Sequence, residues 1–576
     1  MDRGSSSGSL LILFIGYATA FHLPLPSTTA PRPFTNEFRP RAVVRPGATD
    51  ALHATMQDVP KATSPLNQDD LVVTQSEQAA VQWPYDWRKH WYGVGFERDF
   101  PKGEKPFGVT IFDEPMVLFR DGDGILHCVS DFCPHRASKL SEGMVTDGNI
   151  ECLYHGWQFD GKTGSCVHVP QLPEDAKVPR TANLRVYPLA IREGVVYVWM
   201  GDDPWGEGAK DILPVPCTED DLDKTEPSFR FQFVYDLPYD WSYLAENALD
   251  PAHVFFSHHD TESGGNRAAA GPIRFEMLKE GSKALSARGF SAEVLNLHFT
   301  KKGASRRTTY RFEAPGVIRM RAENGYVADE AENEKKEPGM LVGLTVHATP
   351  LGRGRSRVLF DTYSMHAPPL LKFLIRMKPS FLIQLNSCKF VEQDMPQICA
   401  QEDHVARTGR SLSKSFLPIM GSDKLVVELR KWLDHVGHGM PHYTGWKTNK
   451  LPAEHLSDSE ISSSPKYRAK QSRFYNHVIL SKCTREALKN VIRVKRVSLA
   501  TASILAGIAL LISCGAGAVS PIAAASAPAV GGFFKRGWVG IATAVGGAVA
   551  LGVGAAAHKL EGRFYENFER HPVLVT

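Results

Sequence analysis

The sequence predicts an α+β protein of several parts, and three patterns along its 576 residues carry this prediction. Short alternating runs such as PMVLFRDGDGILHCVS and GVVYVWMGD, broken by Gly and Asp, indicate a small all-β domain over residues 83–203. A second domain over residues 225–455 mixes strand-like runs with helical spacing. Two uncharged runs within residues 497–557 predict a hairpin of two membrane-spanning helices.

The composition narrows the class of protein. Hydrophobic residues make up 43% and charged residues 22%, which is ordinary for a globular protein. A formal net charge of +3 is too near neutral to indicate a nucleic-acid partner. Nine cysteines over this length do not resemble a disulfide framework, so we expect a reducing compartment in which paired Cys and His bind metal.

Residues 1–55 are predicted to be a bipartite plastid-targeting presequence. The apolar run Leu10–Ala20 ends in Ala18-Thr19-Ala20, a small-residue pattern that suits signal-peptide cleavage. A Pro-, Arg- and Thr-rich stretch that is poor in acids follows and fits a transit peptide. A buried N-terminal helix is the alternative for the apolar run, and residues 56–82 are expected to be a linker.

The mixed domain has recognisable strands and helices. FRFQFVYDLP and RTTYRFEAPGVIRMRA are typical of strands, and WSYLAENALDPAHVFF is expected to be helical. Apolar residues at helical spacing predict one long helix over Leu370–Arg407. Residues 456–492, which include a Ser- and Lys-rich stretch, are expected to be a linker or amphipathic region.

The C-terminal apolar pair is flanked by basic residues. Lys535 and Arg536 lie between the two runs, whereas Arg493, Lys495 and Arg496 precede them. Lys559 and Arg563 follow. A hairpin leaves both flanks on one side, and the more basic side predicts that the two preceding domains stay on the non-translocated face. Buried Ala/Gly-rich helices of a soluble domain are the alternative.

The strongest local signal is a pair of loops that each offer one thiolate and one imidazole. Cys133-Pro134-His135-Arg136 is followed by Cys152-Leu153-Tyr154-His155-Gly156-Trp157. Two Cys and two His are the ligands of a [2Fe–2S] cluster with Cys on one iron and His on the other. A structural zinc site uses the same ligand set, so the spacing alone leaves both readings open.

A second constellation stands downstream, with Asn247, Asp250, His253 and His258, and His259 beside the last of these. Non-haem iron that activates O2 is usually held by two His and one carboxylate on one face. His253 and His258 are five apart, about 140° round an ideal helix, so the helix must distort or end between them. The carboxylate must come from elsewhere, and within Val391-Glu392-Gln393-Asp394 the chemistry alone allows Glu392 or Asp394.

These motifs together resemble the Rieske non-haem iron oxygenases. The flanks C-P-H-R and C-x-x-H-G-W-x-F favour a Rieske cluster over zinc, and N-x-x-D-x-x-H-x4-H matches at Asn247, Asp250, His253 and His258. The stretch DPAHVFFSHHDTESGGNRAAAGPI resembles the plastid branch of pheophorbide a oxygenases, chlorophyllide a oxygenases and translocon-associated Rieske proteins. That resemblance implies an N-terminal Rieske all-β domain, a helix-grip (START-like) catalytic domain and a C-terminal two-helix membrane hairpin.

The resemblance also implies the sites and their roles. A [2Fe–2S] cluster is expected at Cys133, His135, Cys152 and His155, and a mononuclear non-haem Fe(II) is expected at His253, His258 and Asp394. Asp250 is expected to bridge a cluster His of one subunit to an iron-ligand His of the next, in a homotrimer.

The implied activity is oxygenation of a tetrapyrrole, similar to pheophorbide a or chlorophyllide a, with O2 and electrons from ferredoxin. The implied place is a plastid membrane, either the inner envelope or the thylakoid, with the catalytic domain facing the stroma. Two alternatives remain: an oxygenase of another plastid lipid or a carotenoid-like substrate, and a membrane-bound Rieske electron carrier or redox component of protein import.

Overall fold

The computed structural model describes the two predicted domains and the apolar hairpin. The described residues are 85–100, 103, 105–173, 176–202, 227–258, 267–278, 288–295, 306–324, 339–438, 440, 443–448, 472–517 and 530–567. The predicted presequence, the linker 56–82 and His259 lie outside the described residues.

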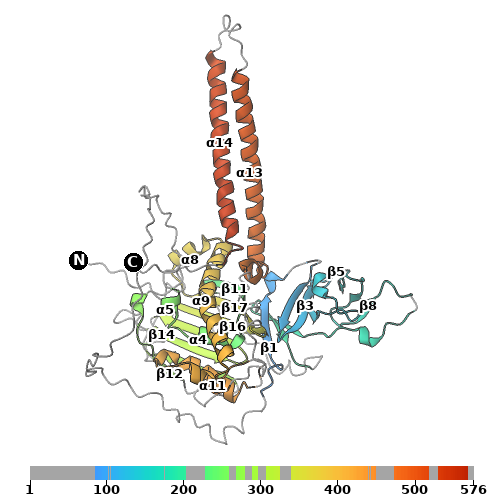
Figure 1. Ribbon diagram of the computed structural model, residues 1–576, viewed down its shortest axis with the longest axis vertical. Coiled ribbons are helices and arrows are strands. Elements are labelled where there is room, and N and C mark those ends of the chain that lie inside the picture. Colours follow the sequence, from blue (N-terminus) through green and yellow to red (C-terminus); the bar gives the residue numbers. More distant parts are fainter. Residues whose placement is uncertain are drawn as a thin grey trace, which may run out of the picture.

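The first domain is built from three small antiparallel sheets, as the alternating runs predict (Figure 1). One sheet has the order β1-β10-β9 and a second has the order β2-β3-β4, while the third runs β5-β6-β7-β8. The strands are β1 Trp91–Phe96, β2 Phe107–Ile111, β3 Glu114–Arg120, β4 Leu126–Ser130, β5 Met144–Thr146, β6 Asn149–Glu151, β7 Gln158–Phe159, β8 Cys166–His168, β9 Leu189–Arg192 and β10 Val195–Trp199. Short 3-10 helices lie at η1 Glu97–Asp99, η2 Leu140–Glu142 and η3 Arg180–Ala182.

The second domain is a seven-stranded antiparallel sheet in the order β11-β17-β16-β15-β14-β13-β12. Its strands are β11 Phe229–Leu237, β12 Phe275–Met277, β13 Gly289–Val294, β14 Arg306–Glu313, β15 Val317–Asn324, β16 Leu341–Gly352 and β17 Arg355–Met365. Its helices are α4 Trp241–Leu249, α5 Val254–Ser257, α8 Pro369–Arg376, α9 Ser380–Thr408, α10 Leu412–Ser415 and α11 Lys424–His435, with 3-10 turns at η5 Arg267–Ala269 and η6 Gly421–Asp423.

The main core of this domain lies where α4, α9 and α11 cover the sheet. Trp241 of α4 and Trp432 of α11 are fully buried there against Phe312 of β14, and α9 contributes Cys388. An antiparallel sheet wrapped against a long helix is the helix-grip arrangement, so the predicted fold class is confirmed.

Two segments that were each expected to be one helix are each two helices. The predicted helix over Leu370–Arg407 is divided into α8 and α9 by residues 377–379, so that prediction was wrong. Pro379 explains the break, because proline disfavours helical backbone in the residue before it and offers no N–H of its own. The break between α4 and α5 has the same cause, since Asp250 precedes Pro251 and is extended at φ −99° and ψ 103°.

The two domains are joined by hydrogen bonds between β1 and the central strands of the large sheet. The Thr349 hydroxyl donates to the Gly93 carbonyl at 2.6 Å, and Arg357 Nη1 donates to the Val94 carbonyl at 2.7 Å. Both side chains are buried, and beside them Phe96 and Tyr197 of the first domain pack with Leu359 of β17, so the contact is part polar and part apolar.

The C-terminal hairpin consists of α13 Lys482–Gly517 and α14 Val530–Gly562, which project together from the body (Figure 1). Lys482–Ile512 and Trp538–Gly562 are long and apolar enough to cross a membrane. Small residues let the helices approach closely: a Cβ added at Gly546 would lie 3.2 Å from Leu505, and one at Gly554 would lie 3.3 Å from Leu499.

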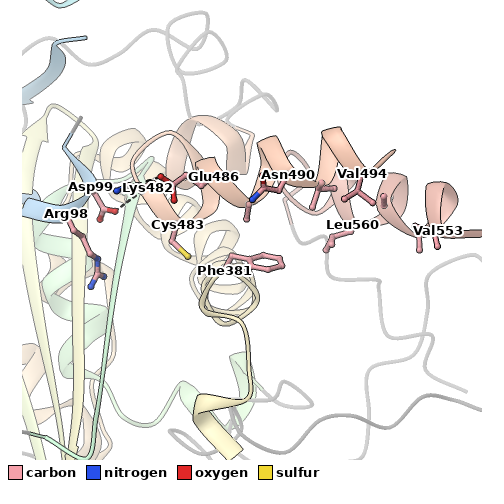
Figure 2. Close-up of a pocket in the computed structure, with 14 residues that line it drawn as sticks. Arg98, Asp99, Phe381, Lys482, Cys483, Glu486, Asn490, Val494, Val553 and Leu560 are labelled. Atoms are coloured by element: carbon pink, nitrogen blue, oxygen red, sulfur yellow. Dashed lines mark hydrogen bonds and ion pairs between the residues drawn. The ribbon is translucent and has the colours of Figure 1, made fainter. Parts of the chain in front are cut away.

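The foot of the hairpin is docked on both domains, as Figure 2 shows. The Lys482 backbone N–H donates to Asp99 Oδ1 of η1 at 2.7 Å, and Phe381 of α9 stacks on Phe564 with ring centroids 6.2 Å apart. The described part of the predicted 456–492 region is therefore structured: it holds the π-helix η7 Phe474–Val478 and the first turns of α13.

Candidate metal centres

The two predicted cluster loops have the same backbone conformation. In the first loop the Cys133 N–H donates to the Ser138 carbonyl and the Ala137 N–H donates to the Cys133 carbonyl, both at 2.9 Å. In the second loop the Cys152 N–H donates to the Trp157 carbonyl and the Gly156 N–H donates back to Cys152, again at 2.9 Å. The fourth residue after each cysteine has a positive φ, 54° at Ala137 and 73° at Gly156.

The loops place their thiols inside and their imidazoles outside. Cys133 and Cys152 are each 2% exposed, and both are free thiols. The rings of His135 and His155 lie 4.5 Å apart at the outer tip of the domain, where His135 is exposed. Burial, together with the neighbouring Cys152, raises the pKa of the Cys133 thiol to about 11.

This arrangement fits a two-iron cluster whose cysteine iron is inside and whose histidine iron faces solvent. Trp157 stacks parallel to His135 at 4.8 Å, and its buried Nε1 has no acceptor among the described residues. A buried donor without an acceptor is costly unless another group completes it, so it suits a loop that packs against an inserted cluster.

The second predicted site brings three side chains together from two parts of the chain. His253, His258 and Asp394 offer ligand atoms that all lie within 4.8 Å of one another. Asp394 Oδ2 is 3.5 Å from His253 Nε2 and 3.2 Å from His258 Nε2. As expected from the spacing, α5 ends at Ser257, and this lets His258 turn toward the same point as His253.

Two residues beside the ligand set hold His258 in place, and the sequence interpretation gave a role to neither. Gln393 Oε1 lies 2.9 Å from His258 Nδ1, so Nδ1–H donates to the amide and Nε2 is left with its lone pair toward Asp394. Phe390 stacks on the same imidazole with centroids 3.5 Å apart. Phe390 and Gln393 lie four residues and one residue before Asp394 in the sequence, but only the fold shows which His they meet.

The structure distinguishes Glu392 from Asp394, the two carboxylates between which the sequence chemistry left the choice open. The Glu392 carboxylate lies on the far side of α9, where it accepts hydrogen bonds from Arg473 Nη2 at 2.5 Å and from the Tyr235 hydroxyl at 3.0 Å. Residues two apart on a helix point about 200° apart, so Glu392 and Asp394 cannot face one site. Asp394 is the acid that meets the histidines.

Asp250 lies beside the ligand set without joining it. Its Oδ2 is 3.5 Å from His253 Nδ1, the ring nitrogen opposite the one that approaches Asp394. Its Oδ1 accepts the Ala252 N–H at 2.7 Å, which fixes the carboxylate at the end of α4. Asp250 and His253 also line a cavity of about 310 Å³ between α4, α9 and α11.

The charges at this site favour a bound cation. Burial lowers the pKa of His253, but the carboxylates of Asp394 and Asp250 outweigh burial and raise it to about 10. Burial likewise opposes ionisation of Asp394, yet His253 and His258 hold its pKa well below its usual range. A buried carboxylate whose charge is balanced by nearby imidazoles is a suitable donor set, with those imidazoles, for a divalent metal.

Comparison with known proteins agrees with both halves of the sequence interpretation. Residues 90–188 match the Rieske [2Fe–2S] domain family, and residues 312–411 match the pheophorbide a oxygenase family. Protein TIC 55 of Arabidopsis thaliana, a chloroplast protein, is 33% identical over 470 residues, which cover 77% of this chain and 80% of that protein. The chloroplast pheophorbide a oxygenase of Arabidopsis thaliana is 28% identical over 393 residues, covering 64% of this chain and 67% of the relative.

Among solved structures, one of a monooxygenase aligns with part of the chain. The crystal structure of dicamba monooxygenase bound to dicamba has 22% sequence identity and a TM-score of 0.45, and the alignment covers 61% of this chain and 98% of that one.

Proposed function

The chain belongs to the Rieske [2Fe–2S] family of chloroplast proteins that includes Protein TIC 55 and pheophorbide a oxygenase, and on this premise we propose that it is an oxygenase of a tetrapyrrole. The proposed substrate resembles pheophorbide a or chlorophyllide a, and the proposed electron donor is ferredoxin. The observation that supports an oxygenase most directly is the convergence of His253, His258 and Asp394, since a protein that only carried electrons would need no second metal site.

We assign the cluster to Cys133, His135, Cys152 and His155, and the mononuclear iron to His253, His258 and Asp394. When bound, these groups would supply stored electrons and the capacity to activate O2. Gln393 then orients the imidazole of His258, and Phe390 packs along its face. Asn247 Nδ2 donates to Asp394 Oδ2 at 3.3 Å, which restrains the carboxylate.

Asp250 is placed to orient the His253 imidazole and to accept the proton on its Nδ1 in a hydrogen bond. Its carboxylate can accept a hydrogen bond from His253 Nδ1–H, and it lines an open cavity that Asp394 also borders. Within one protomer the outer end of the first domain, near β5 and β8, lies apart from α4 and α5 (Figure 1). Both facts favour a homotrimer in which Asp250 also meets a cluster histidine of a neighbouring copy.

The placement that fits this activity is a plastid membrane, with the catalytic body on the stromal side. The hairpin α13–α14 is long enough to span a bilayer, and chloroplast relatives support the compartment. An anchored active site would meet an amphipathic macrocycle where such a molecule concentrates, at the membrane surface. An oxygenase of another plastid lipid or a carotenoid-like substrate would use the same residues, and only turnover separates the two.

A second candidate function is electron transfer to another protein, as a carrier or a redox component of protein import. The cluster tip favours it, because Leu153 and Tyr154 beside His155 are 65% and 59% exposed and offer an apolar docking surface. This function requires the cluster but not the second iron.

The deciding experiment is a single turnover under controlled oxygen. Purified full-length protein is reduced anaerobically and mixed with labelled O2 and a panel of pheophorbides and chlorophyllides, and the products are followed by mass spectrometry. Incorporation of label into one tetrapyrrole by the parent, and its loss in Asp250→Asn, is the expected result.

A matched control is Glu428→Gln, the same carboxylate-to-amide change on α11 at a side chain that does not line the cavity. It should retain full turnover. A cluster that reduces normally while no tetrapyrrole gains oxygen would refute the substrate. Iron analysis that then finds only the two cluster irons would favour the electron carrier.

A further inference from the structure

Helix α8 buries only part of its apolar surface against the body. Leu371 is 9% exposed and packs with Ala367, while Phe229 and Met340 at the ends of β11 and the large sheet lie under the same face. This contact seats the helix across one end of the sheet.

The remaining apolar surface of α8 faces outward. Leu370, Phe373 and Met377 are 69%, 59% and 67% exposed. Positions three and seven residues apart share one face of a helix, so these side chains form a single stripe. Large apolar side chains that gather on one exposed face usually mark an interaction surface.

The stripe is bordered by positive charge. Lys372 and Arg376 lie on α8 next to it, Lys378 follows the helix, and the segment from His366 to Ser380 contains no acidic residue. A short helix with an apolar stripe and basic flanks has the composition of a helix that lies in the membrane interface. The cations would meet anionic lipid headgroups, and their methylene stems would cover apolar surface.

The position of α8 matches that partner. Only residues 377–379 separate α8 from α9, and Phe381 in the first turn of α9 stacks on Phe564 at the foot of α14. Figure 1 shows α8 on the side of the body from which α13 and α14 project. A bilayer that contains the hairpin would therefore come close to the exposed stripe.

We propose that α8 is a second membrane contact, an interfacial helix that rests in the anionic headgroup layer of the bilayer that the hairpin spans. The inference depends on the membrane placement proposed above for α13 and α14. A hairpin alone lets hairpin and body tilt together in the bilayer, whereas a second contact through Leu370, Phe373 and Met377 holds one end of the large sheet against the lipid surface.

Site-specific crosslinking to lipid tests this contact. Full-length protein carrying a benzophenone amino acid in place of Phe373 is reconstituted into vesicles of neutral lipid with or without an anionic lipid, illuminated, and searched for lipid adducts by mass spectrometry. The matched control has the same amino acid in place of Ile191, which is 47% exposed on β9 of the first domain.

We expect at least tenfold more lipid adduct at position 373 than at position 191. In the anionic vesicles, adding Lys372→Glu and Arg376→Glu should lower the yield at 373 several-fold, while an alkaline wash should leave the protein in the membrane. Equal adduct yields at 373 and 191 in protein that resists alkali would overturn the α8 contact alone. Crosslinks from position 373 to a second copy of the chain would also overturn the α8 contact. If alkali releases the protein from the vesicles and few lipid adducts form, the membrane placement of the hairpin is overturned as well.

Discussion

At the scale of single residues, Gln393 decides which nitrogen of His258 faces the proposed iron. Its amide oxygen lies 2.9 Å from His258 Nδ1, and both side chains are buried. A partner that fixes the tautomer of a ligating histidine affects metal binding although it never touches the metal.

We therefore predict that Gln393→Leu weakens iron binding about 10- to 100-fold. The leucine keeps the volume but removes the acceptor, so the neutral imidazole is free to rotate or to exchange tautomers. Iron titration of the apoprotein against a competing chelator measures the change. Glu428→Gln, on α11 at a side chain that does not line the cavity beside this site, should leave the affinity as it is. An unchanged affinity in Gln393→Leu would reduce Gln393 to a packing residue.

The two cluster loops allow a second residue-scale prediction, because one positive φ belongs to glycine and the other to alanine. At Gly156, with φ 73°, an added Cβ would also lie 3.1 Å from Pro170 Cγ. Left-handed backbone costs an L-residue about 1–2 kcal/mol, so Gly156→Ala should destabilise the domain by about that amount.

Ala137→Gly is the mirror test of the same idea. Removing the Cβ relieves the left-handed strain, but it also adds about 0.5–1 kcal/mol of unfolded-state entropy, and the two effects nearly cancel. Thermal unfolding of both variants, with the cluster monitored by its paramagnetic resonance signal, compares them. If Gly156→Ala and Ala137→Gly lose the same stability, the cost depends on the backbone turn and not on which residue occupies the left-handed position.

At the scale of elements, α9 is held from both sides, and its outer partner belongs to the foot of the hairpin. Arg473 donates to Glu392 at 2.7 and 2.5 Å, both side chains are at most 4% exposed, and Arg473 Nη1 also donates to the Arg563 carbonyl at the end of α14 at 2.5 Å. The ion pair and the Arg563 contact thus tie the helix that carries Asp394 to the foot of the C-terminal hairpin.

We predict that Arg473→Met lowers stability by about 3–5 kcal/mol, because it leaves the Glu392 carboxylate buried without its counter-charge. The double variant Arg473→Met with Glu392→Leu should regain most of that loss, since two apolar side chains replace the pair. Thermal unfolding of the parent, the two single variants Arg473→Met and Glu392→Leu, and the double variant completes the double-mutant cycle. The exposed pair Lys482–Glu486, at 3.7 Å, is the control, and breaking it should cost about 1 kcal/mol or less.

The elements that the sequence predicted are those whose signal is local. Alternation located β3 and β4 on either side of the Asp-Gly turn, and uncharged length located α13 and α14. The sequence did not predict the split of α8 from α9, although Pro379 was present, because Pro396 lies inside α9 without ending it. A proline in the sequence therefore does not show by itself where a helix ends, because the outcome also depends on how the helix packs.

The sequence was enough to predict the residues of the candidate site, but not the side chains that contact them. Asp250, His253 and His258 were predicted from a motif within one segment and its resemblance to a family, and the structure places all three together with Asp394. The choice between Glu392 and Asp394 could not follow from spacing, because it depends on Arg473, which lies 81 residues along the chain from Glu392. The role of Gln393 was hidden for the same reason: its partner lies 135 residues away.

At the scale of the whole molecule, the first domain rests on the large sheet through a buried histidine. His347 of β16 is 2% exposed and meets the ring of Tyr197 on β10 edge-on, with centroids 5.6 Å apart. Burial, together with the nearby Arg319, lowers the pKa of His347 to about 3. The imidazole is therefore neutral in the folded protein across the physiological range.

This shift has a definite sign in the dependence of stability on pH. The unfolded histidine titrates near pH 6.5, so below that pH the unfolded chain binds a proton that the folded chain refuses. The contribution of neutral His347 is complete above about pH 6.5 and is lost as the pH falls toward 3. By pH 5 the loss is about 2 kcal/mol, from 2.303RT per pH unit.

We predict that His347→Phe flattens this part of the acid response. The phenyl ring keeps the contact with Tyr197 but cannot bind a proton, so the difference in melting temperature between parent and variant should shift in favour of the variant as the pH is lowered from 7.5 to 5. His435→Phe, at an exposed position of α11, should follow the parent at every pH. If the difference between parent and His347→Phe does not change with pH, His347 is not the group through which acid loosens the contact between the two domains.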